Sequence, residues 1–138
     1  MKELKFTIPM DPVTKKNSQQ LITIKRNGSC RRIVVPSKKY RNYEEDARAV
    51  LSPVEPVPAG TAVNVKALFY MRTRRHVDLT NLNEALHDTL VRCGILEDDN
   101  CCVIVSTDGS RVYYDYNCPR TEVTITETER TFEFAARK

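Results

Sequence analysis

The chain has 138 residues and a formal net charge of +4, and 41% of its residues are hydrophobic. This length fits one domain, residues 1–138, with its own core and no room for a separate substrate domain. No apolar run is long enough to cross a membrane and charges interrupt the N-terminal stretch, so we expect neither a membrane span nor a signal peptide, and a cytoplasmic location.

The positive charge lies mainly in the first third of the chain. Residues 1–48 contain twelve Lys and Arg against five Asp and Glu, whereas residues 49–138 contain ten against thirteen. A basic surface beside an acidic one is typical of a protein that grips DNA next to a metal site, although a solvated surface produces the same imbalance.

The cysteines do not indicate a zinc site or a disulfide framework. There are five of them, an odd number, and no two have the C-x-x-C spacing of a metal-binding pair. We expect reduced cysteines that serve packing, at positions Cys30, Cys93, Cys101, Cys102 and Cys118.

The N-terminal residues predict a strand followed by a polar loop. Leu4–Pro9 alternates apolar and polar side chains, as in a half-buried strand. In the loop Asp11–Ser18, Lys15, Lys16 and Asn17 are residue types that bind DNA phosphates, although such a loop is more often merely solvated.

A basic hairpin is predicted next. Gln20–Lys25 and Arg31–Val35 read as its two arms, and Asn27-Gly28 is a strong turn dipeptide between them. The tip is positively charged and suits contact with a nucleic-acid backbone. Its cations are Lys25, Arg26, Arg31 and Arg32.

A helix, a connector and a long strand follow the hairpin. Ser37 is a suitable N-cap for a helix that runs to about Leu51. Residues 52–60 contain three prolines and read as a connector. The alternating stretch Val63–Met71 predicts a strand that leads into the basic segment Arg72–Asp78.

The stretch His76–Asn100 predicts the central helix. Its apolar residues recur at helical spacing and form a core-facing stripe. They are Leu79, Leu82, Leu86, Leu90 and Cys93. Asp78 or Thr80 is placed to cap the first turn, and Gly94 is placed to end the helix in a left-handed conformation.

Carboxylates cluster around this helix. They lie at its entrance, on its flank and just beyond its end, at Asp78, Glu84, Asp88, Asp98 and Asp99. A hard cation such as Mg²⁺, which prefers oxygen ligands, would offset their repulsion, although caps and a solvated helix face explain the same residues. The cations of Arg72–His76 come directly before them, which suits an enzyme that holds a phosphate backbone over a metal.

The last third predicts strands and a charged tail. Cys101–Thr107, Val112–Tyr116 and Thr121–Glu127 read as strands, and residues 128–138 as either a dimer contact or a flexible extension. The order of elements predicts an α/β (α+β) domain, in which two helices pack on one mixed β-sheet.

The stretch around the central helix resembles the RusA family of Holliday junction resolvases. Those enzymes carry a basic run, the motif D-x-D-N-L, a helix with an Asp before its last turns, a Gly and an acidic pair. The matching residues here are Arg74-Arg75-His76-Val77-Asp78-Leu79-Thr80-Asn81-Leu82, Ala85, Asp88-Thr89-Leu90, Gly94 and Leu96-Glu97-Asp98-Asp99. The resemblance extends from about Phe6 to Glu127.

The resemblance implies a homodimeric, typically phage- or prophage-encoded enzyme of the bacterial host cell. Such an enzyme binds four-way DNA junctions and nicks two strands symmetrically in recombination and repair. It uses Mg²⁺ held by aspartates, with Mn²⁺ as the alternative, and we expect no small-molecule cofactor. The corresponding residues here are Asp78 and Asp99 as catalytic metal ligands, Asp88 as the helical Asp and a further metal ligand, and Asn81 as the motif Asn.

The expected DNA contacts are the basic and polar residues near this site and on the hairpin. They are Lys15, Lys16, Asn17, Arg31, Arg32, Arg74, Arg75 and His76. His76 also suits a general acid, although a His beside arginines is more often a phosphate contact or structural.

Two positions depart from the family pattern. Thr80 stands where the second motif Asp is expected, and Glu84 stands where a helical Lys is expected. Glu84 shares a predicted helix face with Asn81 and Asp88, so we assign it as a catalytic residue and metal ligand that restores the missing carboxylate. The alternatives are a catalytically weakened protein that binds branched DNA, and a nuclease for other branched DNA.

Overall fold

The computed structural model describes residues 3–15 and 19–133 of the chain. Its elements in chain order are β1 (Glu3–Ile8), β2 (Gln19–Arg26), β3 (Ser29–Pro36), α1 (Lys38–Leu51), β4 (Val63–Met71), α2 (Leu79–Arg92), β5 (Ile104–Ser106), β6 (Arg111–Tyr114) and β7 (Arg120–Glu127).

A mixed sheet is the centre of the fold. Its strands lie in the order β1-β7-β4-β5, and β6 also pairs with β4. β4 is antiparallel to β7 and parallel to both β5 and β6. β5 pairs with the start of β4, where Val63 lies beside Ile104, and β6 pairs with its end, where Met71 lies beside Tyr114. The end of β4 therefore leads into the loop of residues 72–78 next to β6.

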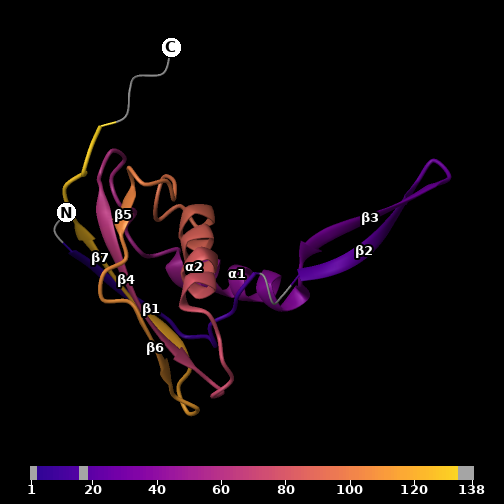
Figure 1. The fold of residues 1–138 in the computed structure, drawn as a ribbon, viewed down its shortest axis with the longest axis horizontal. Coiled ribbons are helices and arrows are strands. Elements are labelled where there is room, and N and C mark those ends of the chain that lie inside the picture. The colour runs from indigo at the N-terminus through magenta and orange to yellow at the C-terminus, as the bar shows by residue number, and fades with distance from the viewer. Residues whose placement is uncertain (1–2, 16–18, 134–138) are drawn as a thin grey trace.

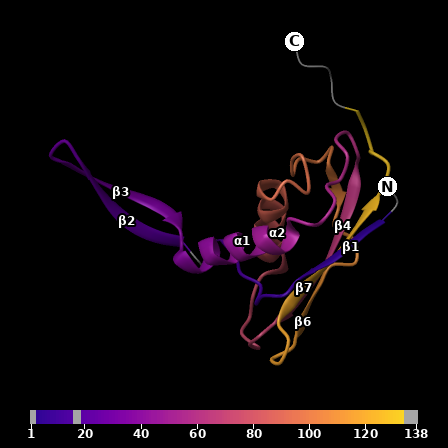
Figure 2. The same ribbon diagram turned by 180° about the vertical axis from the view of Figure 1, so that it is seen from behind.

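Both helices lie on the same side of this sheet (Figure 1), and the reverse view shows the same layering (Figure 2). Alternate residues of β4 face them and are at most 2% exposed, namely Val63, Val65, Ala67 and Phe69. The helices complete the core with Tyr40, Ala47 and Leu51 from α1 and Leu82, Leu86 and Leu90 from α2. The predicted fold class of two helices on a mixed sheet is confirmed.

The hairpin stands apart from the main sheet. β2 and β3 pair only with each other among the described strands, and they project away from the helices (Figure 1). The turn has positive φ at Asn27 (50°) and Gly28 (79°), as the Asn-Gly dipeptide predicts. The side chains of residues 23–32 are exposed.

The strand predicted at Cys101–Thr107 is the clearest difference from expectation, because only Ile104–Ser106 is strand. The carbonyl of Asn100 accepts the N–H groups of Val103 and Ile104, and its side-chain oxygen accepts the N–H of Cys102. These bonds satisfy the backbone locally and form a turn, so the strand starts three residues later than predicted.

All five cysteines, each of which lies in the described part of the chain, are free, as expected. The expected packing role is wrong for Cys30, Cys101 and Cys118, which are exposed, whereas Cys93 and Cys102 are partly buried. Neither α1 nor α2 is long and apolar enough to span a membrane, and no other helix was found in residues 3–15 and 19–133.

Candidate functional site

The site is built around α2. Asp78 occupies the N-cap position, but its side chain does not cap the helix backbone. Asp78 Oδ2 instead accepts a hydrogen bond from Asn81 Nδ2 at 3.3 Å. The helix ends at Arg92, and Gly94 follows with φ of 78°, the left-handed turn that the sequence predicts. The motif residue Asp78 thus lies at the N-terminal end of α2, and the turn at Gly94 leads from its C-terminal end toward the acidic pair.

The two members of the acidic pair have different surroundings. Asp98 Oδ1 accepts the backbone N–H of Asp99 at 2.7 Å, and its Oδ2 accepts a hydrogen bond from Asn100 Nδ2 at 3.0 Å. Asp98 therefore shapes the turn. Asp99, in contrast, lines a hollow against α2.

This hollow, which we call the α2 hollow, has a volume of about 360 Å³. Its lining residues come from one flank of α2, the turn after it and the end of β5. They are Thr80, Asn83, Glu84, His87, Asp99 and Thr107. Two of the predicted carboxylates, Glu84 and Asp99, line the α2 hollow, together with a histidine and an asparagine that the sequence did not single out.

His87 and Asn83 are the site residues that sequence reasoning missed. His87 Nε2 and Asn83 Oδ1 are buried and have no hydrogen-bond partner among the described residues. Burial lowers the pKa of His87 below its usual value, and the carboxylates of Asp99 and Asp88 act in the opposite direction. Their spacing from Thr80 and Glu84 is helical, which is the signal that could have found them.

Asp88 does not line the α2 hollow and instead contacts the loop after β1. Its Oδ2 accepts a hydrogen bond from Lys15 Nζ at 2.7 Å, and both side chains are about three-quarters buried, at 28% and 24% exposure. Lys15 Nζ also lies 5.5 Å from the centre of the Tyr40 ring. Asp88, a predicted metal ligand, and Lys15, a predicted DNA contact, thus neutralise each other in an ion pair. Both assigned roles remain predictions.

The predicted carboxylates do not form a ready-made metal cage. Among residues 3–15 and 19–133, no three His, Cys, Asp or Glu side chains form a group that could hold a metal ion. Mg²⁺, however, is usually held by one or two carboxylates together with water and substrate phosphate. The carboxylates of Glu84 and Asp99, which line one hollow, fit that mode of binding and not a closed four-carboxylate site.

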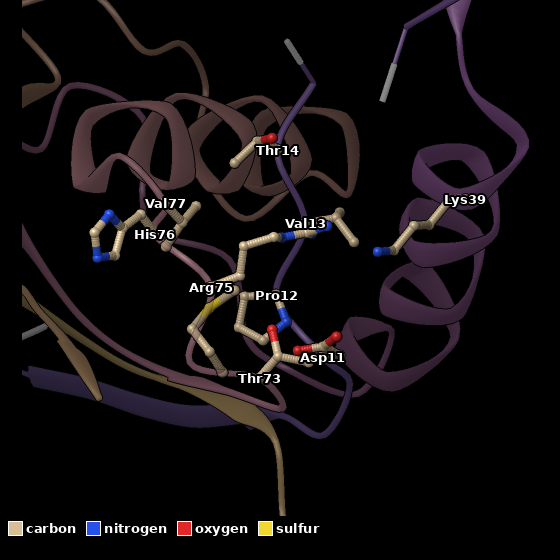
Figure 3. A pocket seen from close by; sticks show the side chains of 10 residues that line it. Asp11, Pro12, Val13, Thr14, Lys39, Thr73, Arg75, His76 and Val77 are labelled. Carbon is tan, nitrogen blue, oxygen red and sulfur yellow. The ribbon is translucent and has the colours of Figure 1, made fainter. Parts of the chain in front are cut away.

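A second, larger cavity lies beside the start of α2 (Figure 3). We call it the loop cavity; its volume is about 480 Å³. It is lined by the loop after β1, by α1 and by the loop between β4 and α2, with the residues Asp11, Pro12, Val13, Thr14, Lys39, Met71, Thr73, Arg75, His76 and Val77. Two of the predicted DNA contacts, Arg75 and His76, are therefore next to Asp78 and on the wall of a cavity.

The other predicted DNA contacts lie in three places. The guanidinium of Arg74 stacks over the Tyr114 ring, 4.5 Å from its centre. Arg31 and Arg32 are exposed on β3, far along the projecting hairpin. Lys16 and Asn17 lie outside the described residues.

The chain also matches a known protein family. A family model described as endodeoxyribonuclease RusA matches residues 9–126, which include the loop cavity, α2 and the acidic pair. A search of curated proteins found no match. Because the family model covers most of the 138 residues, the chain belongs to the RusA family of endodeoxyribonucleases, nucleases that act on Holliday junctions.

Proposed function

We propose that this chain is a Mg²⁺-dependent endodeoxyribonuclease that resolves Holliday junctions by paired symmetric nicks, in DNA recombination and repair. The observation that supports the cutting step is the α2 hollow, in which Glu84 and Asp99 face one space on the matched part of the chain. Thr80 offers a neutral hydroxyl at the same hollow, so Glu84 supplies the second negative charge.

Asp99 and Glu84 are the residues that would hold the metal, with Asp78 at the entrance of the helix. When bound, Mg²⁺ supplies charge stabilisation for the phosphate and lowers the pKa of water, and Mn²⁺ is the alternative ion. Asp88 takes part only when its ion pair with Lys15 opens.

The other residues bind and position the substrate. Asn81 donates to Asp78 and so holds its carboxylate in one orientation at the start of α2. Arg74, Arg75 and His76 precede it on the exposed loop, where cations fix a DNA backbone without reading its sequence. The hairpin adds Arg31 and Arg32 as a second basic surface away from the hollow.

Removing one carboxylate at a time tests this proposal. We expect Asp78→Asn and Asp99→Asn each to lower cleavage of a synthetic four-way junction by more than about 100-fold, beyond the 10- to 100-fold typical of residues that only support a metal ligand. Both variants keep the size and shape of the side chain and leave one acceptor oxygen in place, so junction affinity measured in EDTA should stay within about threefold of wild type.

The control is the wild-type chain with and without Mg²⁺, scored for paired nicks at symmetric positions. Normal cutting by either variant would refute the assigned site. A wild type that binds junctions tightly but cuts none at any Mg²⁺ or Mn²⁺ concentration would favour the second candidate, a branched-DNA-binding protein. That candidate draws support from Thr80 and from the lack of a three-residue ligand group among the described residues.

A further inference from the structure

The loop cavity contains two cations on facing walls. Lys39 extends into it from the first turn of α1, and Arg75 extends into it from the loop between β4 and α2 (Figure 3). The His76 ring is turned away from this space in the same view. Within the described part of the chain, neither Lys39 nor Arg75 forms an ion pair or a hydrogen bond through its side chain.

The charge of the lining is positive. Lys39 and Arg75 are opposed by a single carboxylate, that of Asp11. Asp11 Oδ1 accepts the backbone N–H of Arg72 at 3.0 Å, which ties it to the loop. The cavity therefore carries one unbalanced positive charge, which matches the single negative charge of a phosphodiester.

The cavity also adjoins the proposed cutting site. Its wall ends with Val77, and the next residue is Asp78 at the entrance of α2. Thr80, two residues further, lines the α2 hollow. A phosphate bound in the loop cavity would thus lie beside the start of α2, the segment that connects the loop cavity to the α2 hollow.

We propose that the loop cavity is a phosphodiester-binding site in which Lys39 and Arg75 grip one backbone phosphate of the DNA strand that runs past Asp78. This inference rests on the proposed function and adds a residue, Lys39, and a location for one phosphate. The flat guanidinium of Arg75 suits two-point contact with phosphate oxygens, and the ammonium of Lys39 acts as a point charge from the opposite wall. Thr73 adds a hydroxyl donor to the same lining. Metal cations are disfavoured there, because the lining is already positive.

The experiment measures binding of a synthetic four-way junction in EDTA over a range of salt concentrations. We expect Lys39→Ala to weaken binding about tenfold and to reduce the slope of log affinity against log salt by about one, as for one lost phosphate contact. The matched control is Lys38→Ala, because Lys38 is the exposed neighbour of Lys39 in the same helical turn and does not line the cavity. Thermal unfolding of each variant checks the fold.

A second measurement assigns the contact to one phosphate. A set of junctions, each with a single neutral methylphosphonate near the cut site, should contain one position that weakens the wild type. At that position we expect Lys39→Ala to lose no further affinity, whereas Lys38→Ala should respond as the wild type does. Competition by millimolar inorganic phosphate without any sensitive methylphosphonate position would overturn the assignment to DNA.

The two proposals fail in different ways. If the wild type binds junctions and Lys39→Ala matches Lys38→Ala in affinity and salt slope, the phosphate site is wrong and the proposed function stands. If the wild type binds duplex or single-stranded DNA with a Lys39-dependent slope but shows no preference for junctions, the phosphate site stands and the proposed junction activity is wrong. Binding to none of these DNAs refutes both.

Discussion

Glu84 is the residue on which the chemistry of the α2 hollow depends most. It lies in the same hollow as Asp99, and its neighbour there, Thr80, carries no charge. If Glu84 supplies the second carboxylate, Glu84→Gln should lower Mg²⁺-dependent cleavage nearly as much as Asp78→Asn does, by more than the roughly 10- to 100-fold typical of residues that only support a metal ligand. Thr80→Asp added to Glu84→Gln should then recover part of the loss, because Thr80 lies one helical turn away on the same flank.

The control for this pair of variants is the affinity for a four-way junction in EDTA, which neither change should alter by more than about threefold. A Glu84→Gln variant that cuts like the wild type at every Mg²⁺ concentration would show that Glu84 is a solvated helix residue. Asp78 and Asp99 would then have to serve without it.

The sequence predicted some of these side chains and not others, for a geometric reason. Helical spacing puts Asn81, Glu84 and Asp88 within one arc of α2, which predicts that all three face a single site. In the structure the arc is divided, because Asn81 turns to Asp78, Asp88 turns to Lys15, and Glu84 faces the hollow. The bond between Asn81 and Asp78 is local, whereas Lys15 and Asp99 reach α2 from segments that are distant in sequence. Helical spacing places His87 on the same flank as Glu84, but only the position of Asp99 against that flank shows that His87 borders the hollow.

Elements were easier to predict than their pairing. Alternation and capping placed β4, α1 and α2 within a residue or two, because these signals are local. Nothing local shows that β6 adjoins the end of β4, or that the hairpin forms a sheet of its own. The start of β5 was harder to predict than the strand itself, because Asn100 holds the apolar stretch Cys101–Val103 in a turn.

The hairpin of β2 and β3 is the element with the strongest electrostatic character. From residue 12 to residue 43 the chain contains nine Lys and Arg and no Asp or Glu, and four of those cations lie on the hairpin. A two-stranded hairpin is only marginally stable by itself, and this one pairs with no other described strand. An arm of this charge and exposure suits contact with a DNA duplex at a distance from the α2 hollow.

Shortening this arm should therefore weaken DNA binding without unfolding the domain. We expect deletion of residues 23–32, with an Asn-Gly turn in their place, to lower the salt slope of junction binding by up to about four, because four cations are lost. The melting temperature should change little, since the hairpin contributes no buried core residue among those described. The measurement is affinity against salt for the four-way junction, with calorimetry of the same sample.

A shape-preserving variant distinguishes charge from length. Gln at Lys25, Arg26, Arg31 and Arg32 keeps the hairpin and removes its charge, and we expect it to match the deletion in salt slope. If both variants bind junctions as the wild type does, the hairpin does not contact DNA.

At the scale of the whole molecule, one chain offers one α2 hollow, whereas a four-way junction has two equivalent strands to cut. Paired symmetric nicking by a single small site per chain requires two copies related by a two-fold axis. The structure offers an open edge for such a contact at β6, which pairs only with β4 among the described strands and whose four residues are all exposed. Val112 and Tyr113 on this edge are 38% and 42% exposed.

We therefore predict a dimer in solution that assembles through the β6 edge. A charge on an open edge strand disfavours pairing with a second chain, so Val112→Glu should convert the dimer to a monomer. Phe132→Ala, which changes an exposed apolar residue outside the sheet, is the matched control and should stay dimeric. Sedimentation equilibrium of each protein, free and with a junction, measures the assembly.

A wild type that is monomeric in both states excludes the dimer. Dissociation by Phe132→Ala together with a dimeric Val112→Glu would place the contact at the tail. The monomeric variant should retain single nicks on the junction and lose their pairing, because the hollow of each chain remains intact while the second cut becomes a separate binding event.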